Sequence, residues 1–293
     1  MFDDPPPYRT HALRVAHGHV LHVQESGRPD GCAVLVLHGG PGSGSSPLLR
    51  RFLDPARFRI VAFDQRGAGR STPAGDTAHN TTALLLEDLH TLRRHLGIAR
   101  WHVVGGSWGA TLALAHALAE PTAVEALLLR AVFLARAQDI DAFFADAGVP
   151  WQRMADAAPD EAGVIARAWQ RHEHARAGLP APPPPSPAVL DTLVQRYRIQ
   201  SHYLRHRCWL DAPPLLQRCA GLPRVPTLLL HGTHDAVCPL EGALALQRVA
   251  PHVVLRTVDG AGHDPTHPAM VAAMLEALDG FGASRPCHQA AAA

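Results

Sequence analysis

A serine flanked by glycines at residues 105–109 has the form of a catalytic nucleophile. The segment reads Gly-Gly-Ser-Trp-Gly with Ser107 at its centre, and an apolar run precedes it while a helix-compatible run follows. This pattern is typical of a nucleophile elbow, in which a strand turns sharply into a helix and exposes one serine hydroxyl. The turn is crowded, so a side chain at Gly105 or Gly109 would collide with neighbouring backbone. We therefore predict that Ser107 is presented for acyl transfer.

A serine hydroxyl needs a base and an orienting carboxylate, because it is a poor nucleophile at neutral pH. Two downstream residues have the expected chain order, with the acid before the histidine. Asp235 follows one apolar, strand-like segment, and His263 lies in a glycine-rich loop after another. Asp259 and Asp264 are less suitable orienting acids, because they lie too close in sequence to the histidine. The sequence therefore predicts a triad of Ser107, Asp235 and His263.

A glycine-rich loop early in the chain could supply hydrogen-bond donors for the oxyanion. It reads His-Gly-Gly-Pro-Gly at residues 38–42, directly after an apolar segment. Acyl transfer needs N–H groups aimed at the developing negative charge, and the residue after the nucleophile supplies another. We expect Gly39, Gly40 and Trp108 to form this oxyanion hole. The loop lacks the lysine of a P-loop and the glycine spacing of a dinucleotide site.

Strand-like and helix-like segments alternate on both sides of these residues. The strand candidates are residues 20–25, 32–37, 59–63, 101–104, 126–130, 226–231 and 253–258, and the helix candidates are residues 82–96, 107–119, 240–249 and 268–278. Nearly continuous apolar strands that alternate with helices predict a mostly parallel sheet with helices on both faces. The fold class is therefore α/β.

The middle of the chain differs from its flanks. Residues 134–215 show helical periodicity without strand alternation, and a proline-rich run at residues 179–187 cannot lie inside a helix or a sheet. We predict a core of residues 1–133 and 216–283, with residues 134–215 inserted as a helical cap. Residues 284–293 are predicted to form a disordered tail.

Composition excludes several classes of function. The 293 residues are 47% hydrophobic and 18% charged, which is typical of a globular chain long enough for one large α/β domain. The net charge of +1 and the lack of a basic stripe argue against a nucleic-acid partner. The 20 histidines show neither metal-site spacing nor cysteine partners, so we expect no metal site.

Several features favour a cytoplasmic location. The N-terminus has neither the basic nor the apolar region of a secretory signal, and no apolar run is long enough to span a membrane. The five cysteines are odd in number and widely scattered, which favours reduced thiols. We expect no membrane contact, and the sequence leaves the oligomeric state open.

Four segments together resemble the proline iminopeptidase (prolyl aminopeptidase) branch of the α/β hydrolases. They are residues 38–42, 64–71, 105–109 and 231–239. The second, Asp-Gln-Arg-Gly-Ala-Gly-Arg-Ser, is the most specific, because it separates this branch from lipases and from dehalogenases. The resemblance implies an α/β-hydrolase fold with a helical cap. It also implies a serine peptidase that needs no cofactor and removes an N-terminal residue, preferably proline, from small peptides with a free N-terminus.

The resemblance further implies which side chains bind the substrate. In the family, acidic cap residues hold the free amino group, and Glu173 matches one of them in a segment where His172 replaces a tryptophan. Gln200 stands where the family has the second glutamate, which removes one negative charge from the amine site. A charge-assisted hydrogen bond is roughly twice as strong as a neutral one, so amine recognition should weaken. Phe133 matches a segment that supplies an aromatic wall for the proline ring.

Two other functions stay open at this point. An esterase, amidase or thioesterase would use the same triad on a different acyl substrate, and Gln200 favours that alternative. A non-catalytic binding protein built on this fold would typically lose a triad member, whereas this chain keeps all three.

Overall fold

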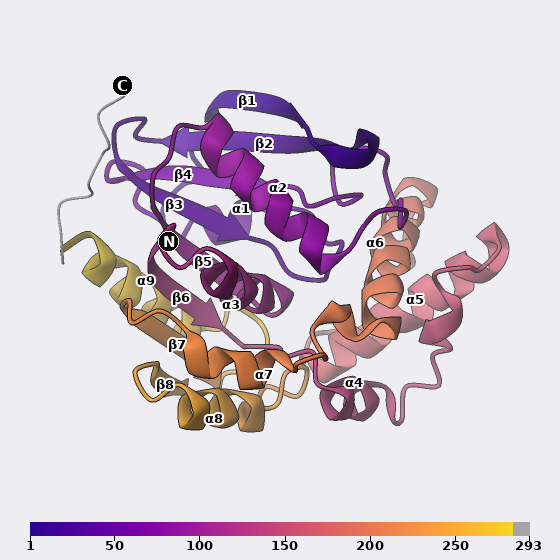
Figure 1. Cartoon of the computed structure of the whole chain (residues 1–293). Coiled ribbons are helices and arrows are strands. Elements are labelled where there is room, and N and C mark those ends of the chain that lie inside the picture. Colours follow the sequence, from indigo (N-terminus) through magenta and orange to yellow (C-terminus); the bar gives the residue numbers. More distant parts are fainter. Residues whose placement is uncertain (284–293) are drawn as a thin grey trace.

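The structure, a computed structural model, describes residues 1–283 and contains one sheet of eight strands in that range (Figure 1). The strand order is β1-β2-β4-β3-β5-β6-β7-β8. Strand β2 pairs antiparallel with β1 and β4, and all other neighbouring pairs are parallel. The predicted mostly parallel sheet is confirmed. The strands are β1 (Pro7–Arg14), β2 (Val20–Gly27), β3 (Cys32–Leu37), β4 (Phe58–Phe63), β5 (Trp101–Gly106), β6 (Val124–Arg130), β7 (Thr227–Gly232) and β8 (Val254–Val258).

Central and edge strands differ in burial, which explains their different sequences. Every residue of β5 is buried, as expected for a strand covered on both faces. Strand β1 is mostly exposed, with Leu13 as its one fully buried residue. The sequence analysis missed β1 because a strand with one buried side chain shows no apolar alternation. Its first residue is Pro7, a residue type that the start of an edge strand tolerates.

Helices cover both faces of the sheet, as predicted. Alternate residues of β3 contribute to two separate apolar clusters, Leu35 and Leu37 to one and Val34 and Val36 to the other. The first cluster also contains residues of α2, α3 and α8, and the second contains residues of α9. The helices of the core are α1 (Pro47–Arg50), α2 (Thr82–His95), α3 (Trp108–Ala119), α7 (Leu215–Arg218), α8 (Leu240–Val249) and α9 (Pro268–Ala283), with short 3-10 turns at Ala16–Gly18 and Cys219–Gly221.

Three further helices follow β6 and lie together beyond one side of the sheet, at the right of Figure 1. They are α4 (Ala137–Phe144), α5 (Pro159–Arg176) and α6 (Pro187–Arg205), with 3-10 turns at Trp151–Arg153 and Arg207–Trp209. The proline-rich run joins α5 to α6. We call α4, α5 and α6 with their connections the cap.

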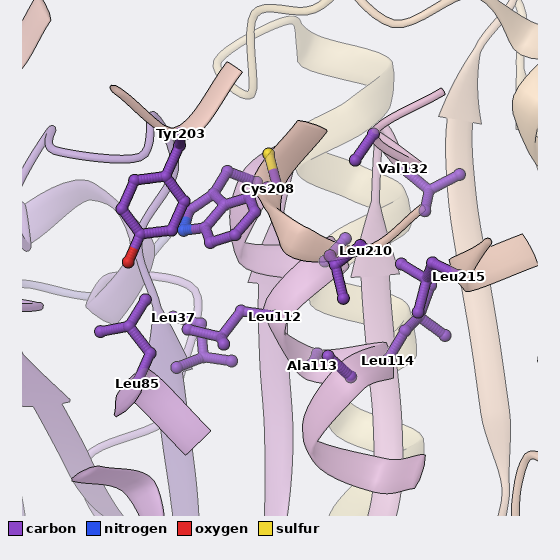
Figure 2. Close-up of a cluster of buried hydrophobic side chains, with 14 of the residues drawn as sticks. Leu37, Leu85, Leu112, Ala113, Leu114, Val132, Tyr203, Cys208, Leu210 and Leu215 are labelled. Atoms are coloured by element: carbon purple, nitrogen blue, oxygen red, sulfur yellow. The ribbon is translucent and has the colours of Figure 1, made fainter. Parts of the chain in front are cut away.

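The cap shares an apolar cluster with the sheet. Tyr203 of α6 is fully buried, and its ring lies 5.2 Å from the Trp108 ring between centroids. Figure 2 shows Tyr203 and Cys208 beside side chains of the core that include Leu37 and Leu85. Within the cap, α5 and α6 pack through stacked rings of Trp169 and Tyr197, with centroids 4.7 Å apart. The cap therefore packs against the core through this shared apolar cluster.

The cysteines do not all follow the sequence expectation. Cys208, Cys219 and Cys238 are free thiols, whereas Cys32 is disulfide-bonded, so the prediction of reduced thiols was wrong for Cys32. Within residues 1–283, no helix combines the length and apolar character needed to cross a membrane, and no cluster of potential metal ligands occurs. The predicted tail, residues 284–293, lies outside the described residues.

Candidate active site

Ser107 lies at the turn between β5 and α3. Its backbone has φ 56° and ψ −124°, a conformation that is costly for a residue other than glycine. The turn is crowded on both sides. A Cβ atom on Gly105 would lie 2.4 Å from the Gly109 carbonyl oxygen, and one on Gly109 would lie 2.3 Å from that of Leu37. The glycines therefore permit a strained turn that presents the serine side chain.

Asp235 and His263 come together from the loops after β7 and β8. His263 Nδ1 lies 2.9 Å from Asp235 Oδ2, while Asp235 Oδ1 accepts hydrogen bonds from the backbone N–H groups of Val237 and Cys238. Burial alone would raise the pKa of Asp235, but the hydrogen bond and charge of His263 and the backbone donors hold it below its usual value. An ionised Asp235 accepts from Nδ1–H and leaves Nε2 of His263 free to act as a base.

Ser107 and His263 line the same cavity, but they are not hydrogen-bonded in this structure. Among the described residues, the contact recorded for Ser107 Oγ is to Cys238 Sγ at 3.9 Å. Catalytic hydrogen bonds are often long or misaligned in substrate-free proteins and tighten when substrate binds. Rotation about the Cα–Cβ bond of Ser107 moves Oγ while the strained backbone stays in place.

The loop after β3 lies over the elbow. A Cβ atom on Gly39 would be 3.5 Å from the carbonyl oxygen of Gly106. Gly40 has φ 111°, and a Cβ atom there would lie 2.8 Å from the backbone nitrogen of Gly42. Only glycine fits this left-handed, crowded position, which lets backbone come close to a reacting carbonyl group.

Two buried side chains fix this loop to the elbow. Burial lowers the pKa of His38 and keeps it neutral, so Nε2 accepts from the Gln65 backbone N–H at 3.0 Å while Nδ1 donates to the Gly39 oxygen at 2.9 Å. The Gln65 amide donates to the His38 oxygen at 3.1 Å and accepts from Trp108 Nε1 at 2.8 Å. Gln65 thus joins both candidate oxyanion segments. The sequence analysis placed it in a motif but missed this role.

The rest of that motif holds two loops together. Asp64 accepts from the Ser45 backbone N–H at 2.6 Å and the Arg70 backbone N–H at 2.9 Å, and a Cβ atom on Gly69 would lie 2.6 Å from its carboxyl carbon. Arg66 forms a two-point ion pair with Asp88 at 2.6 and 2.7 Å, with both side chains buried. Residues 64–71 therefore serve mainly to hold these loops in place.

A buried guanidinium lies beside the proposed triad. Arg130 ends β6 opposite Gly106 of β5, and its Nη1 donates to the backbone oxygen of His263 at 2.7 Å. A Cβ atom on Gly106 would lie 2.9 Å from Arg130 Nη2. Burial lowers the pKa of Arg130, and the charge of Asp235 opposes this shift. The sequence analysis assigned Arg130 no role, although it fixes the loop that carries the histidine.

Core and cap residues line a cavity of about 360 Å³, a size suited to a small molecule. Seven of the nine predicted site residues line it, namely Gly39, Gly40, Ser107, Phe133, Glu173, Gln200 and His263. The other two, Asp235 and Trp108, are buried behind it. Apolar cap side chains, including Ile140, Phe143 and Phe144, complete the wall.

The two cap residues assigned to amine binding are in contact with each other. Glu173 Oε2 accepts from Arg196 Nη2 at 2.7 Å and from the Tyr197 hydroxyl at 2.8 Å. Gln200 Nε2 lies 3.5 Å from Glu173 Oε1. The sequence analysis missed Arg196, because the contact joins two helices and leaves no signal in local spacing.

Known proteins resemble this chain over nearly its whole length. A family model described as the alpha/beta hydrolase fold matches residues 33–267. The proline iminopeptidase of Xanthomonas citri is 36% identical, with 96% of this chain and 99% of the relative covered. That of Arabidopsis thaliana is 37% identical, with 92% and 79% covered. Among solved structures, a proline iminopeptidase-related protein of Thermus thermophilus is 27% identical, has a TM-score of 0.63 and covers 92% of this chain and 97% of its own.

Proposed function

Because the chain belongs to the proline iminopeptidase family of α/β hydrolases, we propose that it removes an N-terminal residue, preferably proline, from short peptides. The observation that carries this proposal is the shared cavity. One cavity between the core and the cap is lined by Ser107, His263 and the cap residue Glu173. A cavity of this size favours one terminal residue over the middle of a long chain.

The proposed reaction proceeds through an acyl-enzyme. Ser107 attacks the scissile carbonyl carbon while Nε2 of His263 takes its proton, and Asp235 stabilises the charged imidazole. Backbone N–H groups of Gly40 and Trp108 receive the oxyanion, with Gly39 shaping the loop. His263 then protonates the leaving amine and activates water, which hydrolyses the acyl-serine and releases the free amino acid.

Substrate binding follows from the walls of the cavity. Phe133 and the neighbouring phenylalanines of α4 offer an apolar surface for a proline ring. Glu173 of α5 and Gln200 of α6 line the same cavity and offer oxygen atoms to the amino group. We propose that these contacts hold the first residue of a peptide with its carbonyl carbon at Ser107.

A second candidate function is supported by the charges of the cap. An esterase, amidase or thioesterase would need the triad but no amine site. Gln200 carries no charge, and Glu173 is paired with Arg196 at 2.7 Å. Both features weaken the expected attraction for an ammonium group.

Hydrolysis of matched substrates separates the two functions. Purified protein is assayed with proline 4-nitroanilide, its N-acetylated form and 4-nitrophenyl acetate. An aminopeptidase cleaves the free-amine anilide faster than the acetylated one, whereas equal rates would refute the proposal. Ser107→Ala is the control, and full activity in that variant would exclude the proposed nucleophile.

A further inference from the structure

The carboxylate proposed to bind the substrate amine is already paired with a cation of this chain. Arg196 and Gln200 are four residues apart on α6, so they lie on one face of the helix. Glu173 faces them from α5, and all three line the cavity. The Arg196 guanidinium also stacks 4.9 Å above the Tyr197 ring. These contacts hold the cation in place beside Glu173.

The charges of the cavity leave no surplus of negative charge. Burial lowers the pKa of Arg196, but the adjacent Glu173 carboxylate outweighs that effect and keeps the guanidinium charged. The lining contains two arginines, Arg130 and Arg196, and two carboxylates, Asp139 and Glu173. Asp139 is paired in addition with Arg136 through contacts of 2.6 and 2.8 Å. An ammonium group entering the cavity therefore meets no unpaired anion among the described lining residues.

The acceptors that stay available for an amine are weak ones. Oε2 of Glu173 already accepts from Arg196 and Tyr197. Oε1 has only the long contact with Gln200, and the Gln200 side-chain oxygen is buried with no hydrogen-bond partner among the described residues. A substrate amine can donate to this neutral oxygen and to Oε1, but it must do so beside the Arg196 charge.

We propose that Arg196 is a specificity-determining residue whose charge neutralises Glu173 and lowers the preference of the site for a free over a blocked N-terminus. The inference rests on the proposed function, because it assumes that Glu173 faces the substrate amine. It extends that function to a substrate class. The site still prefers a free N-terminus, but by a smaller factor than an unpaired Glu173 would give, so N-terminal residues with an uncharged or blocked amino group are also accepted.

The test measures one ratio, kcat/KM for proline 4-nitroanilide divided by kcat/KM for its N-acetylated form. Arg196→Gln raises this ratio about tenfold, mainly through a lower KM for the free amine, because a charge-assisted contact replaces a neutralised one. Arg196→Lys keeps the charge and leaves the ratio near that of the unmodified protein. An unchanged ratio in Arg196→Gln, or an equal rise in Arg196→Lys, would overturn the proposal.

A matched control removes the same charge from the same helix. Arg205 is on α6 and pairs with Asp156 outside the cavity, so Arg205→Gln should leave the ratio unchanged. A second variant tests the Glu173–Arg196 pair by changing the glutamate. Glu173→Gln removes the carboxylate that Arg196 neutralises and lowers the ratio, and adding Arg196→Gln to it should raise the ratio much less than Arg196→Gln does when Glu173 is present. Independent, additive effects of the two changes would contradict the coupling.

Binding distinguishes this inference from the proposed function. In a Ser107→Ala background, calorimetry with L-prolinamide and N-acetylprolinamide measures amine selection without turnover. Tighter binding of L-prolinamide in Ser107→Ala/Arg196→Gln supports the role of Arg196 even when no anilide is cleaved, and unchanged binding overturns it. Failure of the unmodified protein to cleave any anilide refutes the aminopeptidase function alone.

Discussion

Replacing Asp235 by asparagine should invert the hydrogen bonding of the proposed catalytic histidine. In the structure, one oxygen of Asp235 is fixed by two backbone N–H donors at 2.9 and 2.8 Å, and the other faces His263 Nδ1 at 2.9 Å. The two backbone N–H groups need an acceptor, so the side-chain oxygen of the asparagine must point towards Val237 and Cys238. Its NH₂ group then faces Nδ1 and can only donate. The imidazole is forced to carry its proton on Nε2, where the proposed mechanism needs a lone pair.

The expected loss of activity is large, while the loss of stability is small. A wrong tautomer in a serine triad lowers kcat by about 10⁴-fold, which corresponds to roughly 5 kcal/mol of transition-state stabilisation. The shape of the side chain and its bonds to Val237 and Cys238 are kept. We therefore expect the unfolding midpoint of Asp235→Asn to stay close to that of the unmodified protein.

The assay is kcat/KM for the substrate that the unmodified protein cleaves best, measured from pH 6 to 9. Asp259→Asn is the control, because Asp259 lies in an exposed loop and bonds to Thr233 at 3.2 Å. It should retain full activity. An Asp235→Asn variant that keeps more than about a tenth of the activity would refute the tautomer argument. Equal losses in both variants would show a nonspecific effect of charge removal.

Three further predictions concern stability. Gly109→Ala places a Cβ atom 2.3 Å from a backbone oxygen of β3, so denaturant unfolding should show a loss of about 3 kcal/mol. Arg66→Met leaves the Asp88 carboxylate buried without its partner, and the same measurement should show a loss of about 3–5 kcal/mol. Burial lowers the pKa of His116 to about 4, and this neutral ring accepts from Trp101 Nε1 at 3.1 Å. His116 binds a proton at higher pH in the unfolded chain than in the folded one, so the free energy of unfolding should fall by about 3 kcal/mol as the pH drops from 6.5 towards 4. Denaturant titrations of His116→Gln should show a weaker dependence on pH.

The central strands and helices were predictable because their buried residues form apolar patterns within short stretches of sequence. The strand at residues 32–37 and the helix at residues 240–249 have the bounds that the sequence analysis predicted. Strand β1 was missed, because an exposed edge strand needs no apolar pattern. The strained turn at Ser107 was also predictable, since Cβ atoms at its flanking positions, Gly105 and Gly109, would lie too close to backbone oxygens.

Side-chain partners in the candidate site were not predictable to the same degree. Gln65 links the loop after β3 to Trp108, and Arg130 reaches the His263 backbone across the sheet edge. Each contact joins segments tens to more than a hundred residues apart. Only the folded topology brings them together, and glutamine or arginine at such positions has no distinctive spacing.

The proposed catalytic residues are specified by short local motifs, whereas substrate selectivity depends on contacts between residues far apart in the sequence. Each proposed catalytic group is placed by the end of a strand in a rigid sheet, so a short motif is enough to specify it. The proposed amine site instead depends on how α5 and α6 face each other, and Arg196 of α6 pairs with Glu173 of α5. A relative can therefore keep every catalytic motif and still differ in substrate preference. Under the role proposed for Arg196, the charge at position 196 is more informative about the substrate than the elbow that carries Ser107.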